Sequence, residues 1–522
     1  MLPLHAFLLA LLSGSLYALS NIGFGVWPFV FFFLIPFWFA LDTSQSKPNL
    51  KRAGGLGFVF GLCAFATGFP WLLSLTDDFL GSGLFVGSLL WLVFGIWFAL
   101  GFSVYGILYR CLSYKRGPNS VASIAPFILM EWWQVSLFPS YSGAALIKIP
   151  ILAQIADLGG PLLLSTFVIF INSRLYFLFR RYQSKQRFPI NQTVSAAMIF
   201  MLVIIYGHLR SESILEDKHG DPIRIGAVQS NLVKLSKEAL SLRSHAVHVK
   251  QSKDILAKHP VDLLIWPETA YVRGLRRPLP LDAQFIRADI TVPLLFGGTS
   301  VWQKNGKKAK ANSVFLANKQ GSIEQAYDKS KLIPFAEYIP FPSFLTPYKT
   351  HINALFPHSQ SFHSQATQKA INLNTTVIST PICYEIIHPD FIRQQINHMH
   401  PQLIITLAND AWFGDTQEPW IHLSLARLRA IEHRLWVVRS TNSGISAIID
   451  PAGNITSHTG LHTQENLLGT VYPRNTSTYY AQFGNWVGWL ALLFMLLRTY
   501  GLLARHEKFS VLIPPLFSNR RG

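Results

Sequence analysis

Long apolar runs alternate with short polar connections through the first 210 residues of the chain. Several runs approach or reach the roughly 20 residues that an α-helix needs to cross a hydrocarbon core about 30 Å thick. They predict seven membrane-spanning helices, and an eighth run lies near the C-terminus. The predicted spans are residues 4–20, 24–41, 55–75, 83–107, 121–138, 161–180, 194–208 and 484–503. We therefore expect a membrane bundle from residues 1–210, and an eighth helix with a basic tail from residues 480–522.

A different pattern occupies residues 222–475. Short apolar, β-branched runs alternate there with amphipathic stretches, which is typical of an α/β domain. The predicted strands are 223–229, 261–266, 293–297, 313–317, 377–383, 403–408 and 446–450, and the predicted helices are 236–258, 386–397 and 419–434. Residues 338–368 have no clear periodicity and are rich in proline and aromatic residues. A loop of this length is usually functional or disordered.

Composition and charge agree with a membrane protein. Half of the residues are hydrophobic and 14% are charged, whereas soluble domains carry about a quarter charged residues. The formal net charge is +18, but no nucleic-acid recognition motif accompanies it, so we expect no nucleic-acid partner.

The basic residues gather in alternate connections. They are Lys47, Lys51 and Arg52; Arg110, Lys115 and Arg116; Arg180, Arg181, Lys185 and Arg187; and Arg505, Lys508, Arg520 and Arg521. Because basic connections stay on the cytoplasmic side, both termini are expected there. Residues 211–480 are then expected outside the cytoplasm.

One cysteine stands apart from the other two. Cys63 and Cys111 lie in or beside long apolar segments, so Cys383 is the single thiol of the polar part. A lone cysteine is more often a small buried hydrophobe than a nucleophile. The expected compartment permits disulfides, yet the domain has no second cysteine to pair with. A chemical use of Cys383 is therefore favoured. The histidines lack metal-ligand spacing, and we expect neither a metal nor a cofactor.

Two other stretches could meet Cys383. Glu268 follows a predicted buried strand, and Lys329 precedes Glu337 by eight residues. A thiol that attacks an acyl carbonyl needs a base and a positive charge for the oxyanion, and glutamate and lysine supply both. Spacing alone leaves other interpretations open: Glu268 as a solvated carboxylate, Lys329 as a surface lysine and Glu337 as a structural ion-pair partner.

Several stretches together resemble a known family. They are Trp266-Pro267-Glu268; Lys329 with Leu332-Ile333-Pro334-Phe335-Ala336-Glu337-Tyr338-Ile339-Pro340; Pro381-Ile382-Cys383-Tyr384-Glu385; Asn409-Asp410-Ala411-Trp412-Phe413-Gly414-Asp415; His422-Leu423, Ala426-Arg427 and Arg429-Ala430; Arg439-Ser440-Thr441-Asn442-Ser443-Gly444; and, in the membrane part, Glu131-Trp132 and Gln154-Ile155-Ala156-Asp157. The first three resemble the motifs of the nitrilase (CN hydrolase) superfamily. With the eight spans, the pattern is similar to the apolipoprotein N-acyltransferase family of the bacterial envelope.

The resemblance implies a four-layer α-β-β-α nitrilase-like domain on a bundle of about eight transmembrane helices. It implies a two-step (ping-pong) reaction in which Cys383 takes an acyl chain from a membrane phospholipid as a thioester. Glu268 would be the general base, and Lys329 would stabilise the oxyanion together with the backbone N–H after Cys383. The acceptor would be the α-amine of the diacylglyceryl-cysteine of an apolipoprotein. The implied supporting residues are Glu337, Tyr384 and Glu385.

The same resemblance implies a place in the cell and a role for the long loop. The protein would lie in the bacterial inner membrane with its catalytic domain on the periplasmic side. A thioester must be kept from water, so we expect residues 338–368 to act as a lid or lipid-facing arm. Its apolar residues are Phe341, Phe344, Leu345, Tyr348, Leu355 and Phe356.

The chain departs from the family pattern at a few positions. Ala336 stands where glycine is usual, Gln134 stands where an arginine is common, and Glu238 stands where a tryptophan is often found. These differences affect the expected preference for headgroup or acyl chain and leave the catalytic set intact. Two alternatives remain: a membrane-tethered nitrilase-like amidase that hydrolyses a small amide, and a catalytically silent protein that binds lipoproteins.

Overall fold

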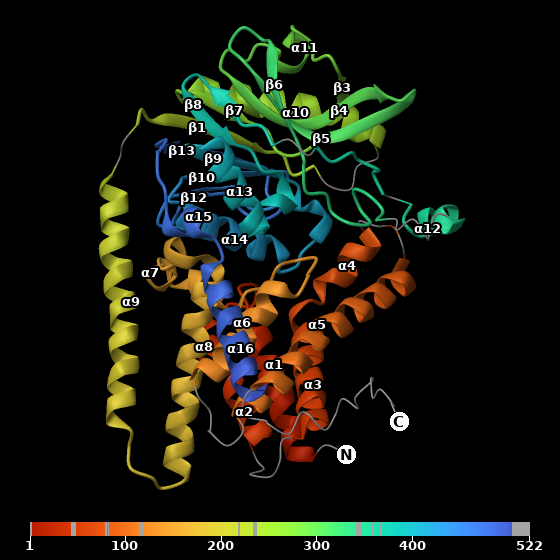
Figure 1. Ribbon diagram of the computed structural model, residues 1–522. Helices are drawn as coiled ribbons and strands as arrows, with labels where there is room; N and C mark the ends of the chain where they lie inside the picture. The colour runs from red at the N-terminus through yellow and green to blue at the C-terminus, as the bar shows by residue number, and fades with distance from the viewer. Residues whose placement is uncertain are drawn as a thin grey trace, which may run out of the picture.

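The computed structural model describes residues 3–42, 49–78, 81, 83–113, 120–217, 220–232, 237–340, 347–357, 359–365 and 368–503. Two sheets with flanking helices stand on one end of a helical bundle (Figure 1). Both ends of the sheet-containing part lead into bundle helices. The chain enters that part from α9 (Ile190–Glu216) and leaves it through α15 (Tyr479–Phe483) into α16 (Trp486–Leu503).

Helices occupy the positions of all eight predicted spans. Besides α9 and α16 they are α1 (Leu4–Ser20), η1 (Trp27–Phe31) with α2 (Leu34–Asp42), α3 (Leu50–Gly68) with α4 (Trp71–Asp78), α5 (Gly83–Ser113), α6 (Ser120–Trp133) and α8 (Ala156–Gln183). Within the described residues, only α5, α8 and α9 are long and apolar enough to cross a membrane by length and composition. The count of eight spans therefore stays a prediction.

Breaks in the helices explain the shorter lengths. The second predicted span divides into η1 and α2, and the third divides into α3 and α4 beside Pro70. Elsewhere, close packing joins the helices. A Cβ on Gly57 of α3 would lie 2.2 Å from the carbonyl oxygen of Phe102 on α5, so only glycine permits this approach.

The first sheet has seven strands in the order β13-β1-β2-β4-β5-β6, with β3 paired to β4. These strands are β1 (Ile223–Gln229), β2 (Leu263–Ile265), β3 (Tyr271–Arg276), β4 (Leu294–Lys304), β5 (Lys307–Ala317), β6 (Ile323–Asp328) and β13 (Glu465–Val471). Strands β1, β2 and β4 run parallel, while β5, β6 and β13 are antiparallel to their neighbours. Asn305 and Gly306 have positive φ at the β4–β5 turn, as a tight hairpin requires.

The second sheet has six strands in the order β12-β11-β10-β9-β8-β7. They are β7 (Ile371–Leu373), β8 (Thr376–Ser379), β9 (Leu403–Ala408), β10 (Val437–Thr441), β11 (Ala447–Ile449) and β12 (Ile455–His458). Apolar side chains of both sheets form one core between them. Ile225, Ile265 and Leu295 of the first sheet share this core with Ile405 and Val438 of the second.

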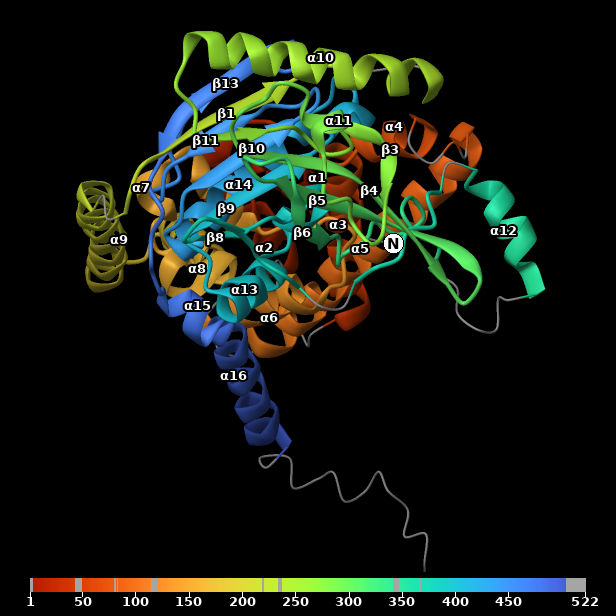
Figure 2. The same cartoon turned by 90° about the horizontal axis from the view of Figure 1, so that it is seen from above.

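Helices cover the outer face of each sheet and complete an α-β-β-α sandwich. The first sheet is covered by α10 (Lys237–Lys258), which lies across its outer face (Figure 2), and by α11 (Gln284–Arg287). The second is covered by α13 (Pro389–Met399) and α14 (Glu418–His433), whose core continues into the bundle. The second sheet therefore lies nearer the membrane part. The predicted domain boundaries, 1–210, 222–475 and 480–522, remain predictions.

Candidate functional site

Three elements bring Glu268, Lys329 and Cys383 together. Glu268 follows β2, Lys329 follows β6, and Cys383 begins the short 3₁₀ helix η4 (Cys383–Ile387). The Lys329 ammonium lies 3.7 Å from the Glu268 carboxylate, and all three side chains are buried. Both residues also act electrostatically on the thiol, because Glu268 raises the pKa of Cys383 and Lys329 lowers it. Residues far apart in the sequence thus form one enclosed cluster.

Lys329 is held between two carboxylates. Its Nζ lies 2.9 Å from Glu337 Oε1, closer than it lies to Glu268. Burial alone would lower the pKa of Lys329, but Glu337 and Glu268 outweigh burial and raise it. The ammonium is therefore a permanent positive charge. Glu337 also accepts a hydrogen bond from the Ile333 backbone at 2.9 Å, which fixes the turn that carries it.

Asn312 of β5 joins the two carboxylates, although no sequence motif indicates it. Its amide nitrogen donates to Glu268 at 2.7 Å and to Glu337 at 3.3 Å. Burial raises the pKa of Glu268 above its ordinary value, against the opposing effects of Lys329 and Asn312. A carboxylate with a raised pKa is a stronger base, which suits proton abstraction from a thiol.

The nucleophile turn differs from the predicted strand 377–383. Strand β8 ends at Ser379, and Pro381, which has no backbone N–H to donate, precedes the turn. Cys383 has a φ of 49°, a strained value for a residue other than glycine. Burial raises the pKa of the Cys383 thiol well above its ordinary value, and Glu268 raises it further. The thiol is therefore neutral at rest.

Glu385 joins the nucleophile turn to the lysine loop. One carboxylate oxygen accepts from the backbone of Ser330 at 2.7 Å and of Lys331 at 2.9 Å. The other accepts from the Ile382 backbone and the Tyr327 hydroxyl, both at 2.8 Å. Burial raises the pKa of Glu385 to about 7. Glu385 thus sets the distance between the Cys383 and Lys329 segments without touching the thiol.

Tyr384 connects the site to the membrane bundle. Its hydroxyl donates to the Leu137 carbonyl, and its ring packs edge-on against Phe138 at a centroid distance of 5.6 Å. Phe138 in turn packs against Trp71 of α4 at 4.9 Å and Phe413 at 6.5 Å. The residue after the nucleophile therefore belongs to an aromatic cluster that continues into the bundle.

One group of residues has the composition of a metal site. Within the described part of the chain, Cys383, Asp410 and His422 place potential ligand atoms within 4.8 Å of one another. Arg439 already donates to Asp410 and lies 3.2 Å from His422 Nδ1. Its guanidinium supplies the positive charge that a metal would bring, so this group fits an arginine-centred network better than a metal.

Other residues singled out in the sequence lie elsewhere. Gln134 donates to the backbone of α5, at Trp97 and Phe98, and so serves helix packing. The side chain of Glu238 lies outside the described residues.

The expected lid is described only in part. Its residues 341–346, including Phe341, Phe344 and Leu345, lie outside the described residues. The part that follows contains α12 (Lys349–Leu355) and then returns beside the site. There the backbone N–H of Phe362 donates to the carbonyl of Glu337 at 2.7 Å, and that of Gln360 donates to the carbonyl of Ala336 at 2.8 Å.

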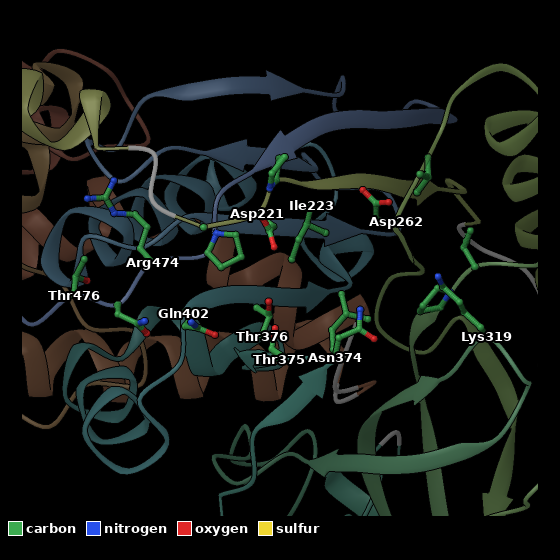
Figure 3. A pocket seen from close by; sticks show the side chains of 18 of the residues that line it. Asp221, Ile223, Asp262, Lys319, Asn374, Thr375, Thr376, Gln402, Arg474 and Thr476 are labelled. Carbon is green, nitrogen blue, oxygen red and sulfur yellow. The ribbon is translucent and has the colours of Figure 1, made fainter.

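A cavity of about 630 Å³ lies away from this cluster, at the amino ends of β1, β2, β8 and β9 (Figure 3). Glu268 and Cys383 instead follow the carboxyl ends of β2 and β8. The charged lining of the cavity is already paired in part. Arg474 pairs with Asp217 at 2.5 Å, and Asp262 pairs with Arg224 at 2.7 Å. The cavity and the buried cluster therefore lie at opposite ends of these strands.

Comparisons with known proteins agree across most of the chain. Residues 224–479 match the carbon-nitrogen hydrolase family, and residues 13–174 match the apolipoprotein N-acyltransferase N-terminal domain. The apolipoprotein N-acyltransferase of Pseudomonas aeruginosa is 29% identical over 520 residues, covering 95% of this chain and 96% of the relative. That of Geobacter metallireducens is 27% identical over 517 residues, covering 94% and 93%.

One solved structure aligns with about half of this chain. Saccharomyces cerevisiae Nit3, a nitrilase superfamily member, aligns with a TM-score of 0.37 at 16% identity, covering 49% of this chain and 91% of Nit3. The sequence matches reach both the bundle and the sandwich. The chain belongs to the apolipoprotein N-acyltransferase family, a membrane-embedded branch of the nitrilase superfamily.

Proposed function

We propose that this chain transfers an acyl chain from a membrane phospholipid, through a thioester on Cys383, to the α-amine of the diacylglyceryl-cysteine of apolipoproteins. The main support is the enclosed cluster of Cys383, Glu268 and Lys329, in a chain that matches N-acyltransferases over both of its parts. A small-amide hydrolase needs the same three residues. It gives no reason for the matched membrane part at residues 13–174.

The first step forms the thioester. Glu268 takes the proton of the Cys383 thiol as the sulfur attacks the ester carbonyl of the phospholipid. The carbonyl oxygen becomes negative and is stabilised by the Lys329 ammonium and the backbone N–H of Tyr384. When the carbonyl re-forms, the C–O ester bond breaks. The lysophospholipid leaves with the proton that Glu268 returns.

The second step reverses the roles of the same groups. The α-amine of the lipoprotein attacks the thioester, Glu268 takes a proton from the nitrogen, and Lys329 again stabilises the oxyanion. The C–S bond breaks, and Glu268 returns the proton to the sulfur. Two easier substitutions thus replace one direct ester-to-amide exchange.

The burial of the cluster supports transfer over hydrolysis. Cys383 is 6% exposed, Glu268 is 7% exposed and Lys329 is fully buried. A thioester formed there is sheltered from water, which would otherwise make the enzyme a phospholipase. Tyr384 and its aromatic neighbours face the bundle, which is the side from which a lipid acyl chain would come.

We further propose that the catalytic domain lies on the periplasmic side of the inner membrane. Helix α8 begins beside the catalytic domain, where Asp157 pairs with Arg434 at 2.9 Å. It ends near Asp42, which pairs with Arg180 at 3.1 Å and lies 3.7 Å from Arg110. The basic residues thus gather at the end of the bundle away from the catalytic domain, which supports this orientation under the positive-inside rule.

An acyl-transfer assay tests the function. Purified protein is mixed with phospholipid and a synthetic diacylglyceryl lipopeptide, and the lipopeptide is followed by mass spectrometry. We expect the N-terminal amine to gain one acyl chain, and we expect Cys383→Ala to abolish this gain. Cys63→Ala is a matched control, because Cys63 is a free cysteine of the bundle. Acylation by Cys383→Ala, or release of free fatty acid alone by the wild type, would contradict the proposal.

A further inference from the structure

A buried histidine, His422, contacts the peptide group between Cys383 and Tyr384. His422 Nε2 lies 3.1 Å from the carbonyl oxygen of Cys383, and His422 comes from α14, 39 residues further along the chain. A carbonyl oxygen only accepts hydrogen bonds, so Nε2 carries the proton in this contact. In the neutral imidazole Nδ1 is then an acceptor, and the Arg439 guanidinium lies 3.2 Å from it as a donor.

This contact sets the direction of the neighbouring N–H. In a trans peptide the C=O and the following N–H point in opposite directions in one plane. With the Cys383 carbonyl turned toward His422, the Tyr384 N–H points away from His422. It also belongs to the first turn of η4, where N–H groups have no acceptor inside the helix. Among the described residues no acceptor takes this N–H, so it can face a substrate oxygen.

His422 is itself fixed by two charged residues. Its Nδ1 accepts from the guanidinium of Arg439 of β10 at 3.2 Å, and Arg439 also donates to Asp410, whose other oxygen lies 3.1 Å from Nδ1. Gly444 packs directly against Asp410, because a Cβ at that position would lie 2.1 Å from Asp410 Oδ2. Asp410, His422 and Arg439 are all buried. The imidazole therefore has little freedom to rotate away from Cys383.

The strained backbone of Cys383 must be held by its surroundings, and the hydrogen bond from His422 is one of the contacts that hold it. Cys383 keeps a φ of 49°, which costs free energy unless the surroundings hold it there. The hydrogen bond from His422 acts on the carbonyl of this same residue. Loss of the bond would let the Cys383–Tyr384 peptide rotate and carry the N–H away from the oxyanion, while the thiol stays next to Glu268.

We propose that His422 is a positioning residue for the oxyanion site: through the Cys383 carbonyl it aims the Tyr384 N–H at the developing negative charge. Asp410 and Arg439 hold the imidazole in place for this task. The inference rests on the proposed acyl transfer through Cys383. It adds a role for three buried residues, two of which, Asp410 and His422, place polar atoms within 4.8 Å of the thiol.

Two reactions of the same thiol separate this role from a general structural one. Acylation of Cys383 by a soluble p-nitrophenyl ester passes through an oxyanion and releases p-nitrophenolate. Alkylation by iodoacetamide forms an S–C bond at a saturated carbon and releases iodide, so it needs no oxyanion stabilisation. Both need the thiol proton to leave. The ratio of the two rates therefore reports the oxyanion site alone.

We expect His422→Leu to lower the acylation rate about tenfold to a hundredfold, somewhat less than removing an oxyanion donor outright, with the alkylation rate near that of the wild type. His422→Gln can donate from a similar position and should recover most of the acylation. His422→Asn, which is too short to reach the carbonyl, replaces His422→Leu if that variant does not fold. His433→Leu is the control, because His433 is a buried histidine of the same helix.

The outcomes are distinct. Equal losses in both rates, unchanged acylation, or no recovery in His422→Gln would each overturn the inference while leaving the proposed function intact. A wild-type protein that is alkylated at Cys383 but never acylated would overturn the proposed function together with the inference.

Discussion

At the scale of single residues, Asn312 affects the pKa of Glu268 and so its strength as a base. Its hydrogen bond of 2.7 Å stabilises the charged carboxylate and so lowers the pKa that burial raises. Glu268 must be deprotonated to act as the base, so activity is lost as pH falls through its pKa. We predict that Asn312→Ala moves the acid limb of the acylation rate to higher pH, measured as a pH–rate profile with a soluble ester.

The control for this prediction is a similar pair elsewhere. Asn454 donates to the Asp450 carboxylate at 3.0 Å, away from the cluster, and Asn454→Ala should leave the profile in place. An acid limb that stays in place, or moves to lower pH, in Asn312→Ala would contradict the account of Glu268.

The residues of the site differ in how visible they are in the sequence. Glu268, Lys329, Glu337 and Cys383 stand in motifs, and the structure brings all four together. Asn312 could not be found, because a single asparagine in a strand looks like any polar residue on a sheet face. Its importance comes from pairing between β5 and the loops after β2 and β6, which is long-range information.

At the scale of elements, Glu385 sets the spacing between η4 and the loop after β6. Each oxygen of its carboxylate accepts two hydrogen bonds. In Glu385→Gln an amide N–H₂ would face donors, leaving buried groups unpaired at a cost of about 1–3 kcal/mol. We predict a lower free energy of unfolding, and an acylation rate reduced about tenfold to a hundredfold because displacement by about 1 Å is costly in catalysis.

The two effects are measured by thermal unfolding and by ester acylation of Cys383. Gln395 provides a comparison, because it donates to the Tyr327 hydroxyl at 3.2 Å one contact further from the turn. Gln395→Ala should reduce acylation less than Glu385→Gln does. Normal acylation in Glu385→Gln would show that the spacing of the two segments does not depend on this carboxylate.

Elements with strong apolar patterns were predictable, and those shaped by tertiary pairing were not. The predicted strands 223–229 and 403–408 coincide with β1 and β9, and the helix predicted at 236–258 nearly coincides with α10. Strands β3, β6, β7, β10, β12 and β13 were missed. Several of them are short or at sheet edges, and β10 carries the buried Arg439, which breaks the apolar pattern.

At the scale of the whole molecule, a buried ionic junction holds the catalytic domain on the bundle. Asp157 of α8 pairs with Arg434 after α14 at 2.9 Å and with Arg210 of α9 at 3.0 Å. Removing one partner leaves a buried charge unpaired, at about 3–5 kcal/mol. We predict that Asp157→Ala lowers the thermal unfolding temperature of the protein in detergent and reduces transfer from phospholipid more than ester acylation of Cys383.

The exposed pair of Arg224 and Asp262 is the control, because solvent screens it. Asp262→Ala should leave both measurements unchanged. Equal effects of Asp157→Ala and Asp262→Ala would mean that the junction does not couple the domain to the bundle.

The membrane part was predictable in position but not in detail. Apolar runs located the helices, whereas the division into η1 and α2 depends on how the chain packs between its neighbours. The orientation stays a prediction that rests on the distribution of basic residues. Contacts such as the pair of Asp157 and Arg434 join residues almost 280 positions apart, so no local sequence pattern predicts them.

The proposed acyl transfer depends on a covalent intermediate on Cys383, which mass spectrometry of the Cys383 peptide detects. Purified protein is incubated with phospholipid alone and then with the diacylglyceryl lipopeptide. We predict that the peptide gains the mass of one acyl chain, and that the lipopeptide then removes this mass and carries it as an amide. A Cys383 peptide that never gains an acyl chain, or one that only water can discharge, would contradict the account.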